Sequence, residues 1–143
     1  MSEPVPPVVA VVETAVYAPD LAAAEAFYGG LLGLPLVGRE PGRHVFFRVG
    51  DAGMLLVFDP AATARGGDLP PHGASGPGHF ALGVRADDLD RWRDHLSAHG
   101  VMIEKELRWP RGGRSIYFRD PAGNSVELVT PGTWAPTRLR FSP

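Results

Sequence analysis

Three side chains that can bind a metal ion stand in apolar segments typical of strands. Glu13 lies in VVETAVY, His79 in GHFALGV and Glu127 in NSVELVT. Carboxylate oxygens and imidazole nitrogens bind divalent cations, and the chain has no cysteine to supply a thiolate. A sheet with one face open to water explains the same residues without any metal. The residues alone therefore leave both a metal site and a solvated sheet face open.

The predicted strands and helices around these side chains repeat within the chain. Residues 42–60 align with residues 113–131 without a gap, and each segment reads as a pair of strands. Upstream, residues 11–34 and 78–101 each read as a strand followed by a helix that starts at an Asp-Leu pair and stops at a glycine. One such half is too small to close a core alone. We therefore predict two paired modules within one domain.

Alternation along the strands predicts which side chains share a face. Glu13 and His79 each alternate with alanine, glycine or tyrosine on one face, while bulky apolar residues occupy the other. The repeat places Glu127 on Leu56, so three of four equivalent strand positions carry a group that can bind metal. This arrangement predicts a cavity with polar contents between the modules.

The predicted boundaries follow from composition. A stretch rich in glycine and proline separates the two copies, and a histidine within it, His72, is expected to be solvated. The pair His95 and His99 is expected to be an exposed helix end rather than a metal site. The units are an N-terminal tail (1–7), a first module (8–60), a linker (61–77), a second module (78–131) and a C-terminal tail (132–143).

Composition excludes several function classes. The 143 residues carry a net charge of −2, which gives no field that would attract nucleic acid. No apolar run approaches the length of a membrane-spanning helix, and the start MSEPVPP has an acid where a signal peptide carries positive charge. We therefore expect a cytoplasmic protein with a small-molecule substrate, without nucleic-acid or membrane partners.

A family resemblance rests on three stretches of the chain. These are ETAVYAPDL with the later FYGGLLGL, then GHFA, and finally YFRDPAGN running into Glu127. Residues 9–131 resemble the vicinal oxygen chelate superfamily, which includes glyoxalase I, bleomycin-resistance proteins, fosfomycin-resistance enzymes and extradiol dioxygenases. The resemblance implies an α+β fold in which two tandem βαβββ modules form an open cup-shaped mixed sheet. It also implies a homodimer, and one divalent metal ion bound by Glu13, His79 and Glu127.

The ligand set differs from the usual family pattern. Family members more often have histidine where this chain has Glu13, and Leu56 stands where members with four ligands have another one. One histidine and two carboxylates favour Mn²⁺ or Zn²⁺, with Mg²⁺, Ni²⁺ and Fe²⁺ also possible. We expect Lewis-acid catalysis on a small oxygenated metabolite chelated through neighbouring oxygens, with Glu13 as the catalytic base or as a fixed ligand. The alternatives are metal-free sequestration of the bleomycin-resistance type and epoxide opening similar to that of the fosfomycin enzymes.

Further pocket residues are predicted around the last two strands. Tyr117 and Ser115 look similar to pocket residues of the fosfomycin enzymes, which implies a catalytic role for Tyr117 and a substrate-binding role for Ser115. In the loop WPRGGR, Arg111 or Arg114 can bind a substrate carboxylate or phosphate, or can simply be solvated. Two aromatic residues can line the cup or belong to the core: Phe46 and Trp109.

Overall fold

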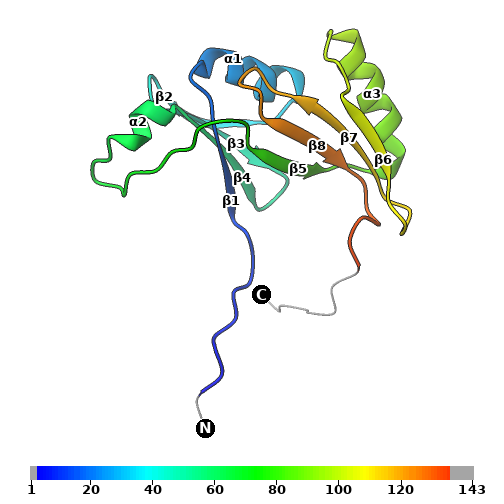
Figure 1. Cartoon of the computed structure of the whole chain (residues 1–143), viewed down its shortest axis with the longest axis horizontal. Helices are drawn as coiled ribbons and strands as arrows, with labels where there is room; N and C mark the ends of the chain where they lie inside the picture. Colours follow the sequence, from blue (N-terminus) through cyan, green and yellow to red (C-terminus); the bar gives the residue numbers. More distant parts are fainter. Residues whose placement is uncertain (1–2, 136–143) are drawn as a thin grey trace.

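The computed structural model describes residues 3–135, which form two modules with the same order of elements (Figure 1). A one-turn helix, α2 (Pro60–Ala64), begins at the last residue of the predicted first module and continues into the predicted linker. The first module consists of β1 (Glu13–Tyr17), α1 (Leu21–Glu25), η1 (Ala26–Leu31), β2 (Leu36–Glu40), β3 (His44–Val49) and β4 (Gly53–Phe58). The second consists of β5 (His79–Gly83), η2 (Ala86–Asp88), α3 (Leu89–Ala98), β6 (Lys105–Arg108), β7 (Arg114–Arg119) and β8 (Ser125–Val129).

Each module contributes one four-stranded mixed sheet. The strand orders are β1-β4-β3-β2 and β5-β8-β7-β6, with the first pair in each sheet parallel and the other pairs antiparallel. The registers coincide, since Phe46 pairs with Leu56 in the first sheet and Tyr117 pairs with Glu127 in the second. The sheets confirm the internal repeat and the predicted α+β fold of two βαβββ modules.

The helix of the first module begins and ends where the sequence predicts, with one difference in its second half. The Asp20 side chain caps the start by accepting a hydrogen bond of 3.0 Å from the amide of Ala23. From Ala26 to Leu31 the helix widens into a π-helix, η1, across the pair Gly29 and Gly30. The ring of Tyr28, which lies in this π-helix, is completely buried.

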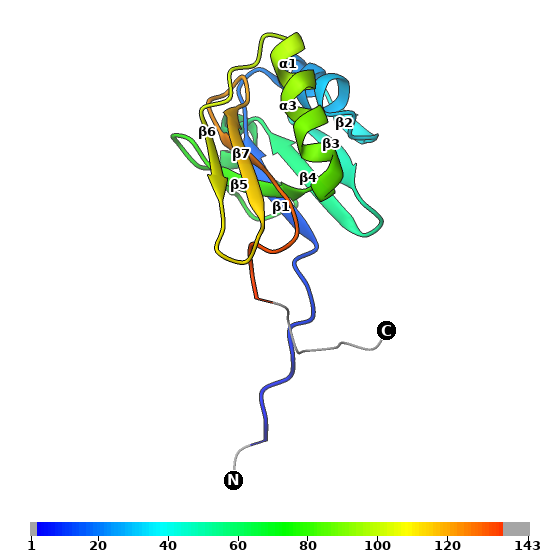
Figure 2. The ribbon, with the colours of Figure 1, turned by 90° about the vertical axis from the view of Figure 1, so that its right-hand side faces the viewer.

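The two modules share one hydrophobic core, which lies on their helix-bearing faces. Phe27 packs on Phe118 with ring centroids 6.0 Å apart, and Tyr28 packs on Phe80 at 6.1 Å. Figures 1 and 2 show α1 and α3 together on one side of the molecule. The opposite faces of the sheets, which carry Glu13 and His79, therefore lie outside this core.

A buried polar contact joins the modules within the core. The Tyr28 hydroxyl donates a hydrogen bond of 2.7 Å to the Asp120 carboxylate. The other carboxylate oxygen accepts from the amides of Ala122 and Asn124, which closes the turn at residues 120–124. The turn that links β7 to β8 is thus tied directly to the helix of the first module.

The segment before β1 is extended and apolar. In Figures 1 and 2 it runs away from the body of the molecule. Five of its side chains are exposed by 63% or more: Val5, Val8, Val9, Val11 and Val12. Among the helices of residues 3–135, none is long and apolar enough to cross a membrane.

Candidate metal centre

His79 and Glu127 come together on the face of the second sheet that lies outside the core. The Nδ1 atom of His79 lies 3.1 Å from the backbone oxygen of Ser125. A carbonyl oxygen only accepts, so Nδ1 carries a proton, and in the neutral imidazole Nε2 then presents its lone pair. That Nε2 atom lies 3.3 Å from Oε1 of Glu127.

Two electron-pair donors that face each other at this distance require positive charge between them. A proton on Nε2 supplies it by forming an imidazolium–carboxylate pair, and a divalent cation supplies it equally well. Ligands about 2.1 Å from one ion lie roughly 3.0–3.4 Å apart at octahedral or tetrahedral angles. The separation of the His79 and Glu127 donors therefore fits two ligands of one metal ion.

The other oxygen of Glu127 is already bound within the protein. Ser115 Oγ donates a hydrogen bond of 2.6 Å to Glu127 Oε2, and Trp109 Nε1 donates one of 2.8 Å to Ser115 Oγ. Glu127 is only 7% exposed, and Ser115 is 1% exposed. The sequence predicted substrate binding for Ser115 and Trp109. In the structure Ser115 forms a hydrogen bond to the Glu127 carboxylate, and Trp109 forms one to Ser115.

Tyr117 lies beside the pair and remains a hydrogen-bond donor. Its ring stacks on His79 with centroids 6.1 Å apart, and Tyr117 pairs with Glu127 across the strands. Partial burial raises the pKa of the Tyr117 phenol above its usual value, and the Glu127 carboxylate raises it further. The phenol is therefore protonated at neutral pH, which suits an acid or a donor better than a base.

Glu13 lies at the start of β1 and is exposed, and its side chain makes no hydrogen bond or ion pair within the described residues. It borders a small cavity of about 120 Å³ together with Phe80 and Ala81 of the second module. Between residues 3 and 135 no three acidic or histidine side chains lie close enough to hold one ion. A single copy thus brings His79 and Glu127 together and leaves Glu13 apart from them.

The remaining predicted site residues lie elsewhere. Arg114 points to the helix side of β7, where its Nη2 atom lies 3.1 Å from Asp90. Arg111 is exposed in the turn before β7. Phe46 belongs to the first sheet and stacks on His44 with ring centroids 3.9 Å apart. None of these three side chains contacts the His79 and Glu127 pair in the part of the chain that the structure describes.

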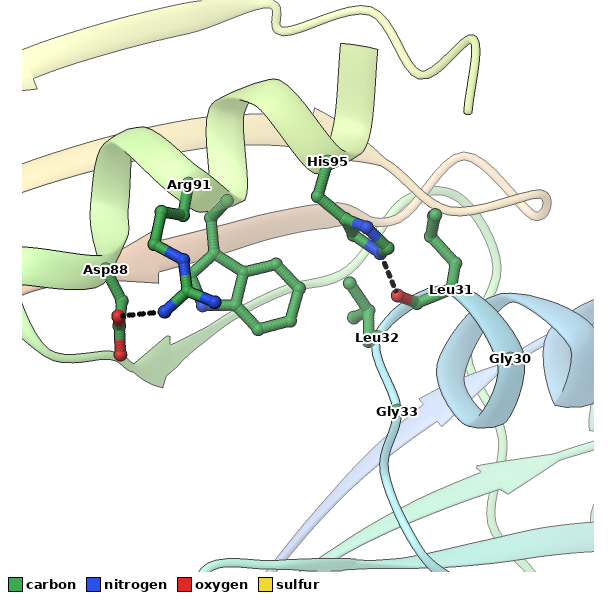
Figure 3. A pocket seen from close by; sticks show the side chains of 8 residues that line it. Gly30, Leu31, Leu32, Gly33, Asp88, Arg91 and His95 are labelled. Carbon is green, nitrogen blue, oxygen red and sulfur yellow. Dashed lines mark hydrogen bonds and ion pairs between the residues drawn. The ribbon is translucent and has the colours of Figure 1, made fainter. Parts of the chain in front are cut away.

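Two histidines that the sequence analysis expected to be solvated take part in tertiary contacts. The Tyr17 hydroxyl and His72 Nδ1 share a hydrogen bond of 2.7 Å, and the ring of His72 meets Phe58 edge-on. His95 donates from Nε2 to the backbone oxygen of Leu31 at 2.7 Å (Figure 3). These long-range contacts leave the rings of His72 and His95 half-buried rather than solvated, whereas His99 is exposed as predicted.

The His95 contact closes one end of a hollow between η1 and α3. This hollow has a volume of about 470 Å³ and is drawn in Figure 3, where the Asp88 and Arg91 ion pair lies at the other end. Trp92 and Leu31 supply apolar walls. The hollow lies on the helix side, and neither His79 nor Glu127 lines it.

The chain matches a family of known proteins. The profile of the Glyoxalase/Bleomycin resistance protein/Dioxygenase superfamily matches residues 10–128. The chain belongs to this superfamily. The family predicted from the sequence is therefore confirmed, and the match spans both modules and all three predicted ligands.

Two relatives are similar over most of the chain, and a third matches 36% of it. The crystal structure of a lactoylglutathione lyase from Agrobacterium tumefaciens has a TM-score of 0.85 and 44% identity, covering 90% of this chain and 98% of that one. Glutathione transferase FosA of Serratia marcescens is 32% identical over 109 residues, which are 76% of this chain and 72% of that protein. Metallothiol transferase FosB of Bacillus licheniformis is 40% identical over 53 residues, 34% of its length.

Proposed function

We propose that this protein is a metal-dependent enzyme that acts on a small oxygenated molecule bound through neighbouring oxygens. The observation that carries the proposal is the pairing of His79 Nε2 and Glu127 Oε1, two lone-pair donors 3.3 Å apart. Both are oriented from behind, His79 by the Ser125 carbonyl and Glu127 by Ser115. Metal ligands in proteins are typically held by such outer hydrogen bonds.

Residues of this chain would bind the ion and act on the substrate. A bound divalent ion would act as a Lewis acid and polarise the substrate oxygens. His79 and Glu127 would hold it through Nε2 and Oε1, and Mn²⁺ or Zn²⁺ suits the donor set. Tyr117 would donate its phenolic hydrogen bond to a substrate oxygen, and Glu13 would bind the ion or move a proton on its carboxylate.

A second copy of the chain is proposed to supply Glu13. Within one copy the modules pack through their helix-bearing faces, so the faces that carry Glu13 and His79 are not turned toward each other. A twofold pairing would set the first-module face of one copy against the second-module face of the other, and would form two equal sites. This arrangement would give each site three protein ligands, with positions left for substrate.

The exposed segment before β1 supports pairing of two copies. Its five exposed valines lead directly into Glu13, and β1 is an edge strand. Extended apolar segments and open strand edges are commonly covered by another chain. The occupant we propose is the second copy, because Glu13 starts the strand that the segment enters.

The first experiment measures metal content by mass spectrometry after purification without chelator or affinity nickel. We expect about one ion per chain in the wild type, and loss of most of it in His79→Ala and Glu127→Ala. Asp51→Ala, in an exposed turn of the first module, is the matched control and should keep the ion. Wild-type protein that takes up none of Mn²⁺, Zn²⁺, Ni²⁺ or Fe²⁺ would leave the metal-free binding function as the better account.

A mixed dimer tests where Glu13 acts. Glu13→Ala and His79→Ala chains with different affinity tags can be co-expressed and the mixed dimer isolated. If Glu13 acts across the dimer, one of the two sites of the mixed dimer has both Glu13 and His79 intact. The mixed dimer should therefore bind about one ion per dimer, whereas the dimer of each parent variant should bind little. Equal losses in the mixed dimer and in both parents would show that Glu13 is not shared between copies.

The relatives narrow the substrates to test. One is named a lactoylglutathione lyase and another a glutathione transferase, so we propose a thiol such as glutathione, or its adduct, as part of the substrate. The metal-loaded protein should be assayed for breakdown of lactoylglutathione and for thiol addition to an epoxide. Glu127→Gln is the inactive control for both reactions, because it removes the charge of the predicted ligand.

A further inference from the structure

The hydrogen-bond chain that ends on Glu127 can run in only one direction. The indole Nε1 of Trp109 is a donor only, so Ser115 Oγ accepts at 2.8 Å. Ser115 must then turn its own proton to Glu127 Oε2, 2.6 Å away. Ser115 is 1% exposed, so water scarcely competes for these bonds.

We infer that Trp109 and Ser115 are positioning residues that hold Oε2 of Glu127 and leave Oε1 as the oxygen that binds the ion. The inference rests on the proposed metal-dependent function. His79 Nε2 faces Oε1, the carboxylate oxygen that does not accept the hydrogen bond from Ser115. A carboxylate held in this way binds an ion through one oxygen, which keeps coordination positions open for the substrate.

The internal repeat supplies a comparison within the same chain. In the first module Leu56 stands at the position of Glu127, and the same strand pairing is kept. The position of Ser115 is taken by His44, whose ring stacks on Phe46. The sheet therefore forms without a serine there, and the hydroxyl occurs in the module that has a carboxylate to hold.

The loop before β7 fixes the indole in place. Trp109 donates from its amide to the Gly113 oxygen at 2.7 Å, and Gly112 donates back to the Trp109 oxygen at 2.9 Å. Gly112 has φ of +96°, and a Cβ on Gly113 would lie 2.6 Å from the backbone nitrogen of Thr133. The glycines of WPRGGR thus allow the close turn that carries Trp109.

The test combines Zn²⁺ affinity with the NMR signal of the indole. Ser115→Ala should lose about 10–100-fold in Zn²⁺ affinity, the usual effect of removing an outer hydrogen bond to a metal ligand. Ser115→Thr keeps the hydroxyl and should restore the affinity. Ser97→Ala, on the exposed side of α3, is the matched control and should bind as the wild type does.

The indole signal reports the hydrogen-bond chain even without metal. The protein has three tryptophans, so at most three indole N–H peaks are expected, and Trp109→Phe identifies the relevant one. This peak should shift in metal-free Ser115→Ala, and in the wild type when Zn²⁺ binds. An unchanged Trp109 peak in Ser115→Ala would overturn the inference, as would a Zn²⁺ affinity equal to that of the wild type.

The two proposals fail in different ways. If the wild type binds no metal but the Trp109 peak shifts in Ser115→Ala, the hydrogen bonds exist but have only a structural role. Both the proposed metal-dependent function and the positioning role are then wrong. If the wild type binds Zn²⁺ and Ser115→Ala binds it equally well, the metal site stands and only the positioning role is overturned.

Discussion

Replacing Tyr28 by phenylalanine tests how the two modules are held together. The Tyr28 hydroxyl is completely buried and donates to the Asp120 carboxylate at 2.7 Å. Burial and the neighbouring carboxylate both raise the pKa of Tyr28 strongly, so the phenol is a neutral donor across the accessible pH range. The substitution therefore removes one buried hydrogen bond to a charged acceptor and leaves the ring packing intact.

The expected cost follows from the partners that Asp120 retains. A hydrogen bond to a charged group contributes about 1.5–3 kcal/mol. The same oxygen of Asp120 still accepts from Asn124 Nδ2 at 2.9 Å after the substitution, so the loss should lie near 2 kcal/mol. In a domain of this size that corresponds to roughly 4–8 °C in the midpoint of thermal unfolding.

Urea unfolding at fixed protein concentration measures the effect, since pairing of copies would make the midpoint depend on concentration. Tyr17→Phe is the matched control, because it removes a part-buried bond to His72 and should cost about 1 kcal/mol or less. Amide exchange at Ala122 and Asn124, which both donate to Asp120, should speed up only in Tyr28→Phe. A stability equal to that of the wild type would refute the view that this contact joins the modules.

Three further predictions concern a histidine, a glycine pair and the extended segment. Burial, with the Arg43 charge adding to it, lowers the pKa of His44, so the unfolded chain binds more protons and stability should fall as the pH drops below about 6.5. In His44→Gln that fall should be smaller, as thermal unfolding between pH 7.5 and 5.5 would reveal; an identical fall would exclude His44 as the cause. Gly113→Ala should destabilise by about 1–3 kcal/mol, because its Cβ would meet the backbone of residues 132–133, whereas Gly30→Ala, with open space around the new Cβ, should be neutral or slightly stabilising in urea unfolding. Equal effects of the two glycine substitutions would contradict this reasoning. Removal of residues 2–9 should weaken pairing, seen by analytical ultracentrifugation as a larger share of single chains, and an unchanged mass distribution would assign the pairing to other surfaces.

Local sequence patterns were enough to predict the parts of the fold that depend on short-range order. Alternation and the gapless alignment of residues 42–60 with 113–131 predicted the strands and showed which strands correspond. The same alignment identified Leu56 as the position equivalent to Glu127. Alternation also placed His79 and Glu127 on one sheet face, and the structure brings them together. These features are local, because side-chain direction in a strand is fixed by the pleat.

How the modules pack and which side-chain atoms are in contact could be seen only in the folded chain. Packing through the helix-bearing faces separates Glu13 from His79 and Glu127 within one copy, and nothing in the strand pattern specifies which faces pack. The structure also turned Trp109 and Ser115 toward Glu127 Oε2. Such contacts join residues through a loop whose path depends on glycine conformations and on the distant segment at Thr133, so they follow from long-range packing rather than from local sequence.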